Sequence, residues 1–578
     1  MSGKPSKYCA TRAVLIGIIF LLWLMVLAGR AGYLQLYCGA WLTDKAQNQF
    51  TEELVLRAKR GTIYDTHHQA MAVSVETTSI AAYPHAVKNK AGTASKLARV
   101  LKLKPRTVQQ KLSSRKSFVW LKRQASPKQV AAIRKLDIDG IEFLPEHCRF
   151  YPNTTLGAQV LGFTGIDGHG LEGLEFFYDR ELKGAEQRIT VIKDALGRGF
   201  DADQLAGIHR AGNNLVLTLD RHIQYIAEQV LAKTVTEHKA RSGMVIVMVP
   251  ETGALLALAH YPFFNPNAFG QYHRDTWRNR AITDPFEPGS TMKIFSAAAA
   301  LESGVSRANT IYYCENGAYP IGRHTIHDTK AYGWLSLQQI VKYSSNIGAV
   351  KVVEKVGPET LYEHLQGFGF GRRTGIDCPG ESVGTLSNFK HWTAVDTGAI
   401  AFGQGVSVTG LQLISAVAAL ANNGMMMRPY IVQAVTDQNG RLLRTVEPVA
   451  QRQVVGAKTA RTVRRIMRTV ITEGGTGTMA DLEGYSVCGK TGTAQKIDQN
   501  GTYAHDRYVA SFVGFAPTER PALAALVVID EPQDTFYGGL VAAPAFKEII
   551  EQTLGYLNIA PAGGRQKLRV SRDISGNG

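Results

Sequence analysis

The sequence predicts an α+β protein, in which an antiparallel five-stranded sheet flanked by helices stands on an elongated mixed α/β pedestal behind one N-terminal transmembrane helix. Three observations predict this arrangement: an uncharged apolar run near the amino terminus, a region of mixed short elements, and a final region with strands at both ends and helices between them. The predicted segments are a cytoplasmic tail (1–12), the anchor (13–33), the pedestal (34–212), the main domain (213–557) and a basic, disordered tail (558–578).

The anchor is predicted from length and flanking charge. Residues 13–29 are apolar and uncharged, and Tyr33, Leu34 and Leu36 extend this character towards the ~20 residues that a spanning helix needs. A cleaved signal peptide is the alternative, but its apolar region usually runs ~7–15 residues. The charged residues before the run are all basic, so the amino terminus is expected in the cytoplasm and the rest of the chain outside the plasma membrane. No cysteine follows the run at once, so a lipoprotein site is not expected.

The chain is strongly basic, with 65 Lys and Arg against 48 Asp and Glu and a formal net charge of +17. One explanation is a solvated basic surface. The other is work beside an anionic lipid or an anionic polymer outside the membrane. Nucleic acid is not an expected partner, because an exported domain does not meet it and no nucleic-acid motif occurs. The two explanations of the charge stay open on the sequence alone.

Cysteines and histidines predict neither a metal site nor a disulfide framework. The six cysteines are scattered with no C-x-x-C, and one pairing among the exported cysteines stays open. His324, His327 and Asp328 lie close in sequence but lack a further ligand, so a structural role or a place lining a cleft is expected. No metal and no cofactor are expected.

The pedestal shows short elements and no catalytic constellation. Ser126 is a helix N-cap, followed by Pro127 at the first helical position and by Gln129 of a capping box. Residues 118–121 and 141–144 have the composition of short strands. This region is therefore predicted to be a scaffold or interaction domain.

The main domain opens at about Asn214, with a strand at 215–220 and a helix at 223–234. Two apolar strands at 244–249 and 254–259 flank Pro-Glu-Thr-Gly, which predicts a hairpin. Three further strands come late, at 485–495, 508–515 and 522–529. Together these strands predict one sheet built from both ends of the domain, with the helix that begins near Ser290 buried against it.

That helix carries the first chemical motif. Pro288 and Gly289 mark its entry, Ser290 falls in its first turn, and an apolar run continues to Ala300. Ser290 and Lys293 are three residues apart and so share a helix face, near a terminus whose dipole favours negative charge. S-x-x-K alone is a weak signal: it recurs at Ser113 and at Ser387, where an exposed pair is expected.

Two further motifs follow in the same domain. Ser344 and Asn346 form S-x-N, which recurs by chance in the tail, whereas Lys490-Thr491-Gly492 is the single K-T-G and is followed by Thr493. S-x-x-K, S-x-N and K-T-G in this order resemble the signature of penicillin-binding proteins and class A β-lactamases.

The same K-T-G also satisfies G-x-x-x-x-G-K-[ST], the phosphate-binding P-loop, over residues 484–491. A P-loop needs a strand before its glycine loop and a helix after it. Here the intervening residues are apolar, and the residues that follow continue as a strand towards a loop. Nucleotide binding is therefore not expected. The glycine-rich residues 474–478 are likewise predicted to be a flexible loop rather than a phosphate cradle.

The three motifs together can perform acyl transfer. A serine hydroxyl needs a base, and Lys293 can act as one only when neutral, although a free lysine has a pKa of ~10.4. Burial and a nearby cation such as Lys490 lower that pKa, and a shift of ~3 units corresponds to about 4 kcal/mol. Ser344 is suited to relay a proton to the leaving amine, and Asn346 to orient Lys293 and to bind a substrate amide.

The K-T-G strand is expected to bind the substrate. Lys490 with the hydroxyls of Thr491 and Thr493 offers a receptor for a carboxylate, and Gly492 lies between them. The backbone N–H groups of Ser290 and Thr493 are expected to form an oxyanion hole, each donor contributing roughly 3 kcal/mol.

Over nearly its whole length, the chain resembles a class B penicillin-binding protein, a peptidoglycan D,D-transpeptidase. Arg60-Gly61-x-Ile63-x-Asp65 resembles the family signature after the anchor, and residues 149–152 and 170–175 match the family's non-catalytic, dimerisation-type pedestal. Residues 403–409, 530–532, 537–539 and 542–544 are most similar to the division-specific penicillin-binding protein 3 branch. The chain departs from the family at 66–69, where Arg and a following Gly are usual, and this puts the local pedestal geometry in question.

The resemblance implies a β-lactamase/transpeptidase-like fold for the main domain. It also implies cross-linking of peptidoglycan stem peptides ending in D-Ala-D-Ala, through a serine acyl-enzyme that β-lactams also form, during septal wall synthesis. No glycosyltransferase domain fits before Asn214, so a membrane-embedded glycan polymerase and other division proteins are the implied partners. The alternatives are a D,D-carboxypeptidase or β-lactamase-type hydrolase, and a non-catalytic penicillin-sensing scaffold.

Overall fold

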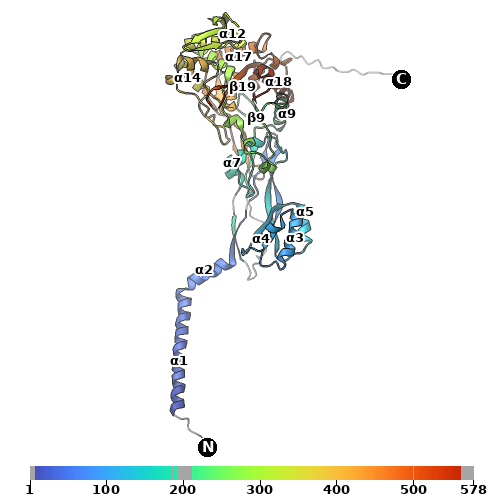
Figure 1. The fold of residues 1–578 in the computed structure, drawn as a ribbon, viewed down its shortest axis with the longest axis vertical. Helices are drawn as coiled ribbons and strands as arrows, with labels where there is room; N and C mark the ends of the chain where they lie inside the picture. The colour runs from blue at the N-terminus through green and yellow to red at the C-terminus, as the bar shows by residue number, and fades with distance from the viewer. Residues whose placement is uncertain (1–6, 57, 185–186, 193–210, 499, 562–578) are drawn as a thin grey trace, which may run out of the picture.

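The computed structural model describes residues 7–56, 58–184, 187–192, 211–498 and 500–561. Figure 1 shows an elongated molecule in which α1 (Lys7–Gly32) and α2 (Gly39–Phe50) lead to a pedestal, with a larger domain at the far end. The apolar side chains of α1 are exposed along its length, and the helical segment at residues 8–37 is long and apolar enough to cross a membrane. Of the predicted tail at 558–578, residues 562–578 lie outside the described residues.

A separate lobe forms the lower pedestal. The long strand β3 (Ala70–Ala82) pairs with β5 (Ile141–Phe150) and with β4 (Val119–Ala125). Three helices complete the lobe: α3 (Lys90–Leu101), α4 (Pro105–Leu112) and α5 (Pro127–Arg134). They enclose a core of their own, with Leu97, Leu101 and Leu121 among its buried residues. The predicted capping box of Ser126 and Gln129 is confirmed, and both predicted strands are present but longer than expected.

The upper pedestal shares a sheet with the main domain. Strand β7 (Asn214–Leu217) lies parallel to β2 (Ile63–Tyr64) and antiparallel to β15 (Val432–Thr436). The strand predicted at 215–220 is therefore present, but it joins the pedestal sheet. The remaining pedestal elements are β1 (Thr51–Leu56), which pairs with β6 (Gln187–Ile192), and the short helices α6 (Ala158–Leu161), α7 (Gly173–Phe177) and α8 (Asp179–Leu182).

A buried charge cluster holds the upper pedestal together. Arg60 Nε lies 2.6 Å from Glu175 Oε2, and Arg60 Nη1 lies 2.6 Å from Asp179 Oδ1. Arg149 Nε donates to Glu175 Oε1 over 2.6 Å, and the Tyr151 hydroxyl donates to the same oxygen over 3.3 Å. One cluster thus contains residues from all three segments that resemble the family's pedestal, at 60–65, 149–152 and 170–175.

At 66–69, where the chain departs from the family, the backbone forms a closed turn. The Asp65 carboxylate accepts from the N–H groups of His67 and Gln69, and His68 takes a left-handed conformation. His67 Nε2 lies 3.0 Å from Asp220 Oδ2, which ties the turn to the main domain.

The main domain contains the predicted five-stranded antiparallel sheet, in the order β18-β19-β20-β8-β9. The strands are β8 (Ser242–Met248), β9 (Leu255–Tyr261), β18 (Cys488–Ile497), β19 (Tyr503–Ala516) and β20 (Leu523–Asp530). Helices α9 (Arg221–Glu237) and α18 (Gly538–Tyr556) cover one face, and α16 (Gly410–Ala421) covers the other. Side chains alternate accordingly: Val245 and Val247 belong to the core under α9 and α18, and Ile246 to the core that includes α16.

A helical layer lies beside the sheet and contains the predicted serine helix. Its main helices are α11 (Lys293–Glu302), α12 (Leu337–Tyr343), α13 (Asn346–Val356), α14 (Pro358–Gly367), α15 (Ala394–Ala401) and α17 (Ala457–Ile471). Helix α11 packs chiefly on α13 and α17, while the preceding 3₁₀ turn η5 (Gly289–Met292) contacts β18. The predicted burial of this helix against the sheet is thus met by its first turn, since η5 contacts β18, whereas α11 behind it packs mainly on neighbouring helices.

Short elements complete the domain: α10 (Arg280–Thr283), β10 (Ile311–Tyr313), β11 (Ala318–Ile321), β12 (His324–His327), β13 (Trp334–Ser336), β14 (Met425–Met427), β16 (Leu442–Thr445) and β17 (Ala450–Gln453). All six cysteines lie in the described part of the chain, and each is free.

Candidate active site

Ser290 lies in the turn η5, one turn before the α-helix that Lys293 begins. Gly289 allows this turn, because its φ of +54° is rare for other residues and a Cβ there would approach Thr493 O to 2.9 Å. The position of Ser290 thus differs slightly from the prediction, since the serine precedes the α-helix. Its hydroxyl still points along the face that carries Lys293, as the next contacts show.

The Lys293 amine lies at the centre of the site. Its Nζ is 3.0 Å from Ser290 Oγ, 2.7 Å from Asn346 Oδ1, 2.6 Å from the Ser344 carbonyl oxygen and 3.2 Å from Ser344 Oγ. An uncharged amine in this position can accept the serine proton while it donates to Asn346 and to the Ser344 carbonyl.

Ser344 links this amine to a second one. It ends α12 in a left-handed conformation, with φ of 62°. Lys490 Nζ donates to Ser344 Oγ over 3.0 Å and also contacts the carbonyl and hydroxyl of Thr491. The hydroxyl of Ser344 therefore bridges Lys293 and Lys490. The structure brings together all five predicted catalytic positions: Ser290, Lys293, Ser344, Asn346 and Lys490.

Burial sets the charge of both amines. The side chains of Lys293 and Lys490 are buried, with residue exposures of 1% and 0%. Burial lowers the pKa of Lys293 to about 7, against a smaller opposing effect of the Asp328 carboxylate. Burial and the charge of Lys293 hold the pKa of Lys490 well below its ordinary value. Near neutral pH, a large fraction of Lys293 is thus available as a base.

The predicted substrate strand is an edge of the sheet. Lys490, Thr491, Gly492 and Thr493 lie in β18, which pairs with β19 on one side and has its other edge towards η5. Thr493 Oγ1 accepts from the Gly538 N–H over 3.1 Å, so its own hydrogen can point to a ligand. Thr491 Oγ1 lies 3.0 Å from Thr476 Oγ1, which places the predicted loop at 474–478 beside this strand. The strand continues to Ile497 and has no helix after it, so the context of a P-loop is absent here.

Asp328 is a positioning residue whose specific role was not predicted from the sequence. Its carboxylate accepts from Ser345 Oγ over 2.6 Å and from the N–H groups of Asn346 and Ile347, at the start of α13. Asn346 Nδ2 donates to the His327 carbonyl over 3.0 Å. A carboxylate such as that of Asp328 is typical at a helix N-terminus, but the sequence does not indicate which helix it caps, and the fold shows that this helix is α13.

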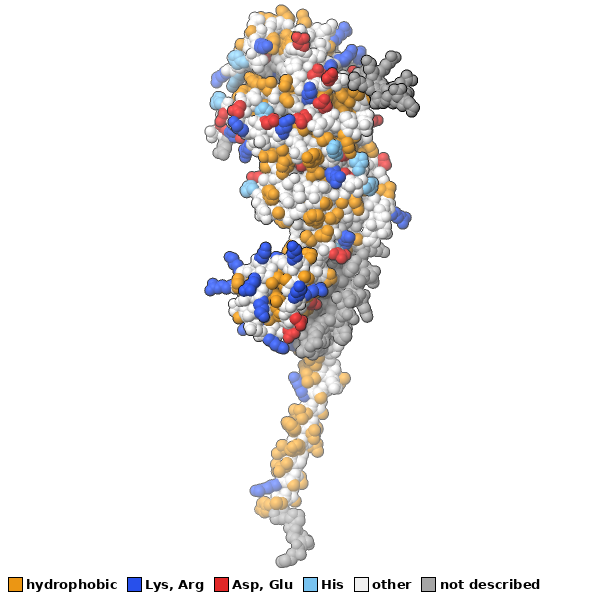
Figure 2. All heavy atoms as spheres, turned by 90° about the vertical axis from the view of Figure 1, so that its right-hand side faces the viewer, with side chains coloured by type: hydrophobic (Ala, Val, Ile, Leu, Met, Phe, Trp, Pro, Cys, Tyr) orange, Lys and Arg blue, Asp and Glu red, His pale blue; other side chains and the backbone are white. Residues whose placement is uncertain are grey.

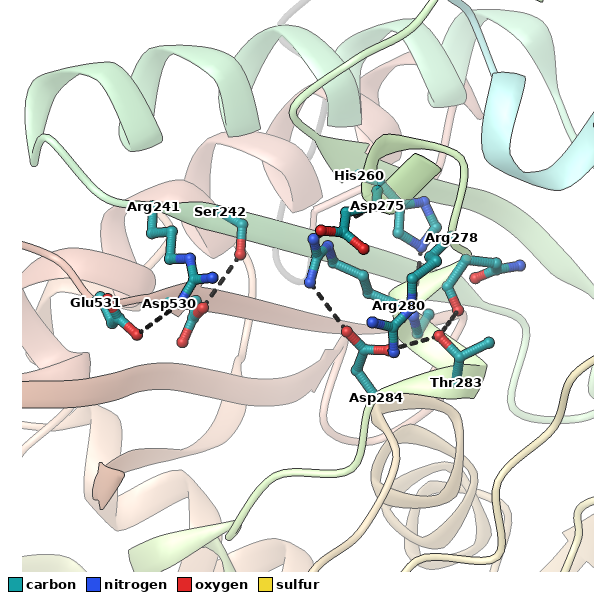
Figure 3. Close-up of polar contacts among 12 residues, drawn as sticks. Arg241, Ser242, His260, Asp275, Arg278, Arg280, Thr283, Asp284, Asp530 and Glu531 are labelled. Carbon is teal, nitrogen blue, oxygen red and sulfur yellow. Dashed lines mark hydrogen bonds and ion pairs between the residues drawn. The ribbon is translucent and has the colours of Figure 1, made fainter. Parts of the chain in front are cut away.

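Ion pairs fix the segments around the site (Figure 3). Asp284, just before the Ser290 stretch, pairs with Arg278 and, over 2.9 Å, with Arg280. At the end of β20, Ser242 donates to Asp530 and Arg241 pairs with Glu531, each over 3.2 Å. Lys496 on β18 reaches the same two carboxylates. Both the entry to the serine turn and the far end of the substrate strand are therefore held in place.

The two other S-x-x-K sequences have no such surroundings. Ser113 and Lys116 are exposed beyond the end of α4. Ser387 and Lys390 are also exposed, Ser387 before the 3₁₀ turn Phe389–His391 and Lys390 within it. Their hydroxyls therefore have no buried amine nearby in the described structure.

Comparison with known families agrees with this geometry. Residues 243–551 match the penicillin binding protein transpeptidase domain, and residues 55–217 match the penicillin-binding protein dimerisation domain.

Two curated relatives cover most of the chain. The "Probable peptidoglycan D,D-transpeptidase PenA" of Neisseria meningitidis is 35% identical over 93% of this chain and 91% of the relative. The "Peptidoglycan D,D-transpeptidase FtsI" of Escherichia coli is 33% identical over 95% of this chain and 92% of the relative. Among solved structures, penicillin binding protein 3 of Mycobacterium tuberculosis in complex with aztreonam is similar with a TM-score of 0.69, at 28% identity, over 88% of this chain and 98% of that one.

Proposed function

Because this chain belongs to the class B penicillin-binding proteins of the penicillin-binding protein 3 type, and is a peptidoglycan D,D-transpeptidase, we propose that Ser290 is its nucleophile and Lys293 its base. One observation carries the proposal: a buried amine with a pKa of about 7 lies 3.0 Å from the Ser290 hydroxyl. That amine can remove the proton of the hydroxyl during attack.

Acylation then follows in one sequence. Ser290 Oγ attacks the carbonyl carbon of the terminal D-Ala-D-Ala amide, and its proton passes to Lys293. The negative charge on the carbonyl oxygen is stabilised by the N–H groups of Ser290 and Thr493. As the C–N bond breaks, Ser344 relays the proton to the leaving amine, and D-Ala departs. Ser344 suits this role because its hydroxyl bridges Lys293 and Lys490.

The second step of the reaction, transfer of the acyl group to the acceptor amine, reverses these proton transfers. The amine of a neighbouring stem peptide attacks the acyl-enzyme, gives up a proton through the same relay, and restores the Ser290 hydroxyl. β-Lactams acylate Ser290 by the first half alone, because their ring amide opens without a leaving group that can diffuse away.

Substrate binding is assigned to the edge of β18. The hydroxyls of Thr491 and Thr493 would donate to the terminal carboxylate, and Gly492 lets the peptide approach the strand. Lys490 is wholly buried and contacts the Thr491 hydroxyl, so it would act through Ser344 and through its positive charge rather than by direct contact. The carboxylate in turn would favour the charged form of Lys490.

The proposed topology places residues 1–12 in the cytoplasm, one spanning helix within 13–33, and the pedestal (34–212) and transpeptidase domain (213–557) outside. The exposed apolar helix α1 and the basic residues before it support this orientation. The matched families, at 55–217 and 243–551, support the proposed division into domains. A glycan polymerase in the same membrane and other division proteins would be the partners, since no described domain of this chain can make glycan.

Labelling with a fluorescent penicillin tests the nucleophile. We expect Ser290→Ala to abolish covalent labelling, whereas Ser113→Ala and Ser387→Ala, matched controls with the same S-x-x-K spacing, keep it. Labelling that survives in folded Ser290→Ala would refute the assignment. Adding a glycan polymerase and lipid-linked precursor to the reconstituted protein then separates transfer from hydrolysis: cross-linked product supports the transpeptidase, and released D-Ala without cross-links would instead indicate a carboxypeptidase.

A further inference from the structure

The positive charge of this protein is concentrated in one part of the pedestal. Residues 88–135, here called the basic lobe, contain 15 Lys and Arg and no Asp or Glu. The whole chain has a formal charge of +17, so the rest of the sequence contributes only +2. Figure 2 shows these basic side chains gathered over the lobe, whereas acidic and basic side chains are mixed on the domain above it.

Most of this charge faces solvent and is unpaired. Eleven of the basic side chains are exposed: Lys88, Lys96, Arg99, Lys102, Lys104, Arg106, Arg115, Lys116, Lys128, Arg134 and Lys135. Among the described residues of the basic lobe, only two have a carboxylate within ion-pair distance. Lys88 pairs with Asp139, and the half-buried Arg123 pairs with Glu146 and Asp167. Mutual repulsion of the remaining charges therefore goes uncompensated within the described structure, which favours an external anionic partner.

We propose that the basic lobe docks on anionic phospholipid headgroups of the membrane that α1 spans. Its place in the molecule supports this partner: α2 and β1 lead from α1 directly into the pedestal, and Figure 1 places α3, α4 and α5 between α2 and the transpeptidase domain. Because the lobe is tethered beside the bilayer, weak attraction per residue is enough to hold it there.

The composition of the surface fits a lipid headgroup layer. The charges spread over three helices and their loops rather than around one pocket, as recognition of a planar, diffuse anionic surface requires. A partly buried aromatic group, Tyr83, Phe118 and Trp120, lies among them, with the Arg123 guanidinium over the Trp120 ring. Aromatic rings beside basic residues are typical of the membrane interface.

Such docking would tilt the pedestal and fix the height of the cleft above the membrane. The inference rests on the proposed anchor, but not on the chemistry at Ser290. Penicillin labelling of the same samples therefore reports separately on the proposed function.

Lysine footprinting of the full-length protein in lipid nanodiscs tests the proposal. One set of discs is phosphatidylcholine, and the other holds equal parts of phosphatidylcholine and phosphatidylglycerol. We expect acetylation of Lys102 and Lys104, read by mass spectrometry, to slow about fivefold in the anionic discs. The attraction of a single basic residue to such a surface shifts its binding equilibrium by about this factor. Lys458, exposed on α17 in the transpeptidase domain, serves as the internal control and should react equally in both.

Salt and charge reversal sharpen the result. About 0.5 M salt should remove the protection, because it shortens the Debye length to a few ångströms. Lys102→Glu/Lys104→Glu/Arg106→Glu should also remove the protection of Lys96 and Lys116, whereas the matched control Lys458→Glu/Arg461→Glu/Arg465→Glu should keep it. Equal acetylation in both discs would overturn the proposal. Protection that appears only in native membranes would also overturn it, and would assign the lobe to an acidic protein or wall polymer.

Discussion

Two regions of this molecule bury charged side chains, and they do so in opposite ways. In the upper pedestal, the guanidinium groups of Arg60 and Arg149 face the carboxylates of Glu175 and Asp179 over distances of 2.6 Å. In the cleft, the amines of Lys293 and Lys490 contact neutral oxygen atoms instead, and they share one of these, the Ser344 hydroxyl.

The consequences for the pKa differ accordingly. In the pedestal, burial opposes the charge of Arg60, but Glu175 and Asp179 outweigh it and raise the pKa. In the cleft, burial lowers the pKa of Lys293 to about 7. Burial is thus common to both, and the presence or absence of a directly bonded counter-ion decides whether a buried charge stabilises the fold or becomes reactive.

Removing the cleft amine should give the largest effect. We expect Lys293→Met to slow penicillin acylation roughly 10³-fold or more, because Ser290 loses its base. The free energy of unfolding should not fall, since the amine is buried without a directly bonded counter-ion. Stopped-flow acylation and denaturant unfolding measure the two quantities. Lys458→Met, on the exposed face of α17, is the control, and wild-type acylation by folded Lys293→Met would break the comparison.

Removing the pedestal carboxylate should have the reverse pattern. Glu175→Ala leaves two buried guanidinium groups without their shared partner and should lower the free energy of unfolding by about 3–5 kcal/mol. Acylation per folded molecule should stay unchanged. Denaturant titration measures the stability, with the exposed Glu172→Ala as control. Unchanged stability of Glu175→Ala would mean that this cluster does not hold the pedestal together.

The sequence allowed the cleft to be predicted better than the pedestal, for a physical reason. Ser290 and Lys293 are related by helical spacing, and the sheet followed from apolar strands and a turn. Ser344, Asn346 and Lys490 lie far from Ser290 in the sequence, and their place in the cleft was predicted from the resemblance of the three motifs to a known signature. The pedestal cluster joins Arg60 to Glu175, and Asp328 caps a helix that begins 18 residues later. Such pairings depend on the tertiary fold. The pairing of β7 with β2 was missed for the same reason, since a short apolar strand does not specify its neighbour.

Glu228 offers a third case, a buried carboxylate with no cation bonded to it in the described structure. It accepts from the Gly157 N–H over 2.7 Å and from Gln224 Nε2 over 2.9 Å, where the pedestal meets α9. Burial raises its pKa from 4.5 to about 7. The unfolded chain ionises first as pH rises, so stability should decrease between pH 4.5 and 7 and level off above that range.

Glu228→Gln should therefore remove this pH dependence and stabilise the protein by up to about 3 kcal/mol above pH 7. Thermal unfolding across pH 4.5–8 measures it, with the exposed Glu237→Gln on the same helix as the control. A variant with the wild-type pH profile would show that this carboxylate is solvated or paired in solution.

Removing the charge of Asp328 should give the smallest effect. This change tests whether a counter-ion that is not directly bonded raises the pKa of Lys293, as the bonded carboxylates raise that of Arg60 in the pedestal. Its carboxylate raises the pKa of Lys293 against the effect of burial. Asp328→Asn keeps the side-chain shape and an oxygen for the N–H groups of Asn346 and Ile347, but removes the charge. The pKa of Lys293 should then fall further, so acylation should persist to lower pH than in the wild type.

The ascending limb of the acylation rate against pH measures this shift. The control variant Asp481→Asn removes an exposed carboxylate paired with Arg468 and should leave the limb in place. A limb that stays or moves to higher pH would mean that Asp328 acts on Asn346 through hydrogen bonds alone, and that the charge state of Lys293 is set by burial.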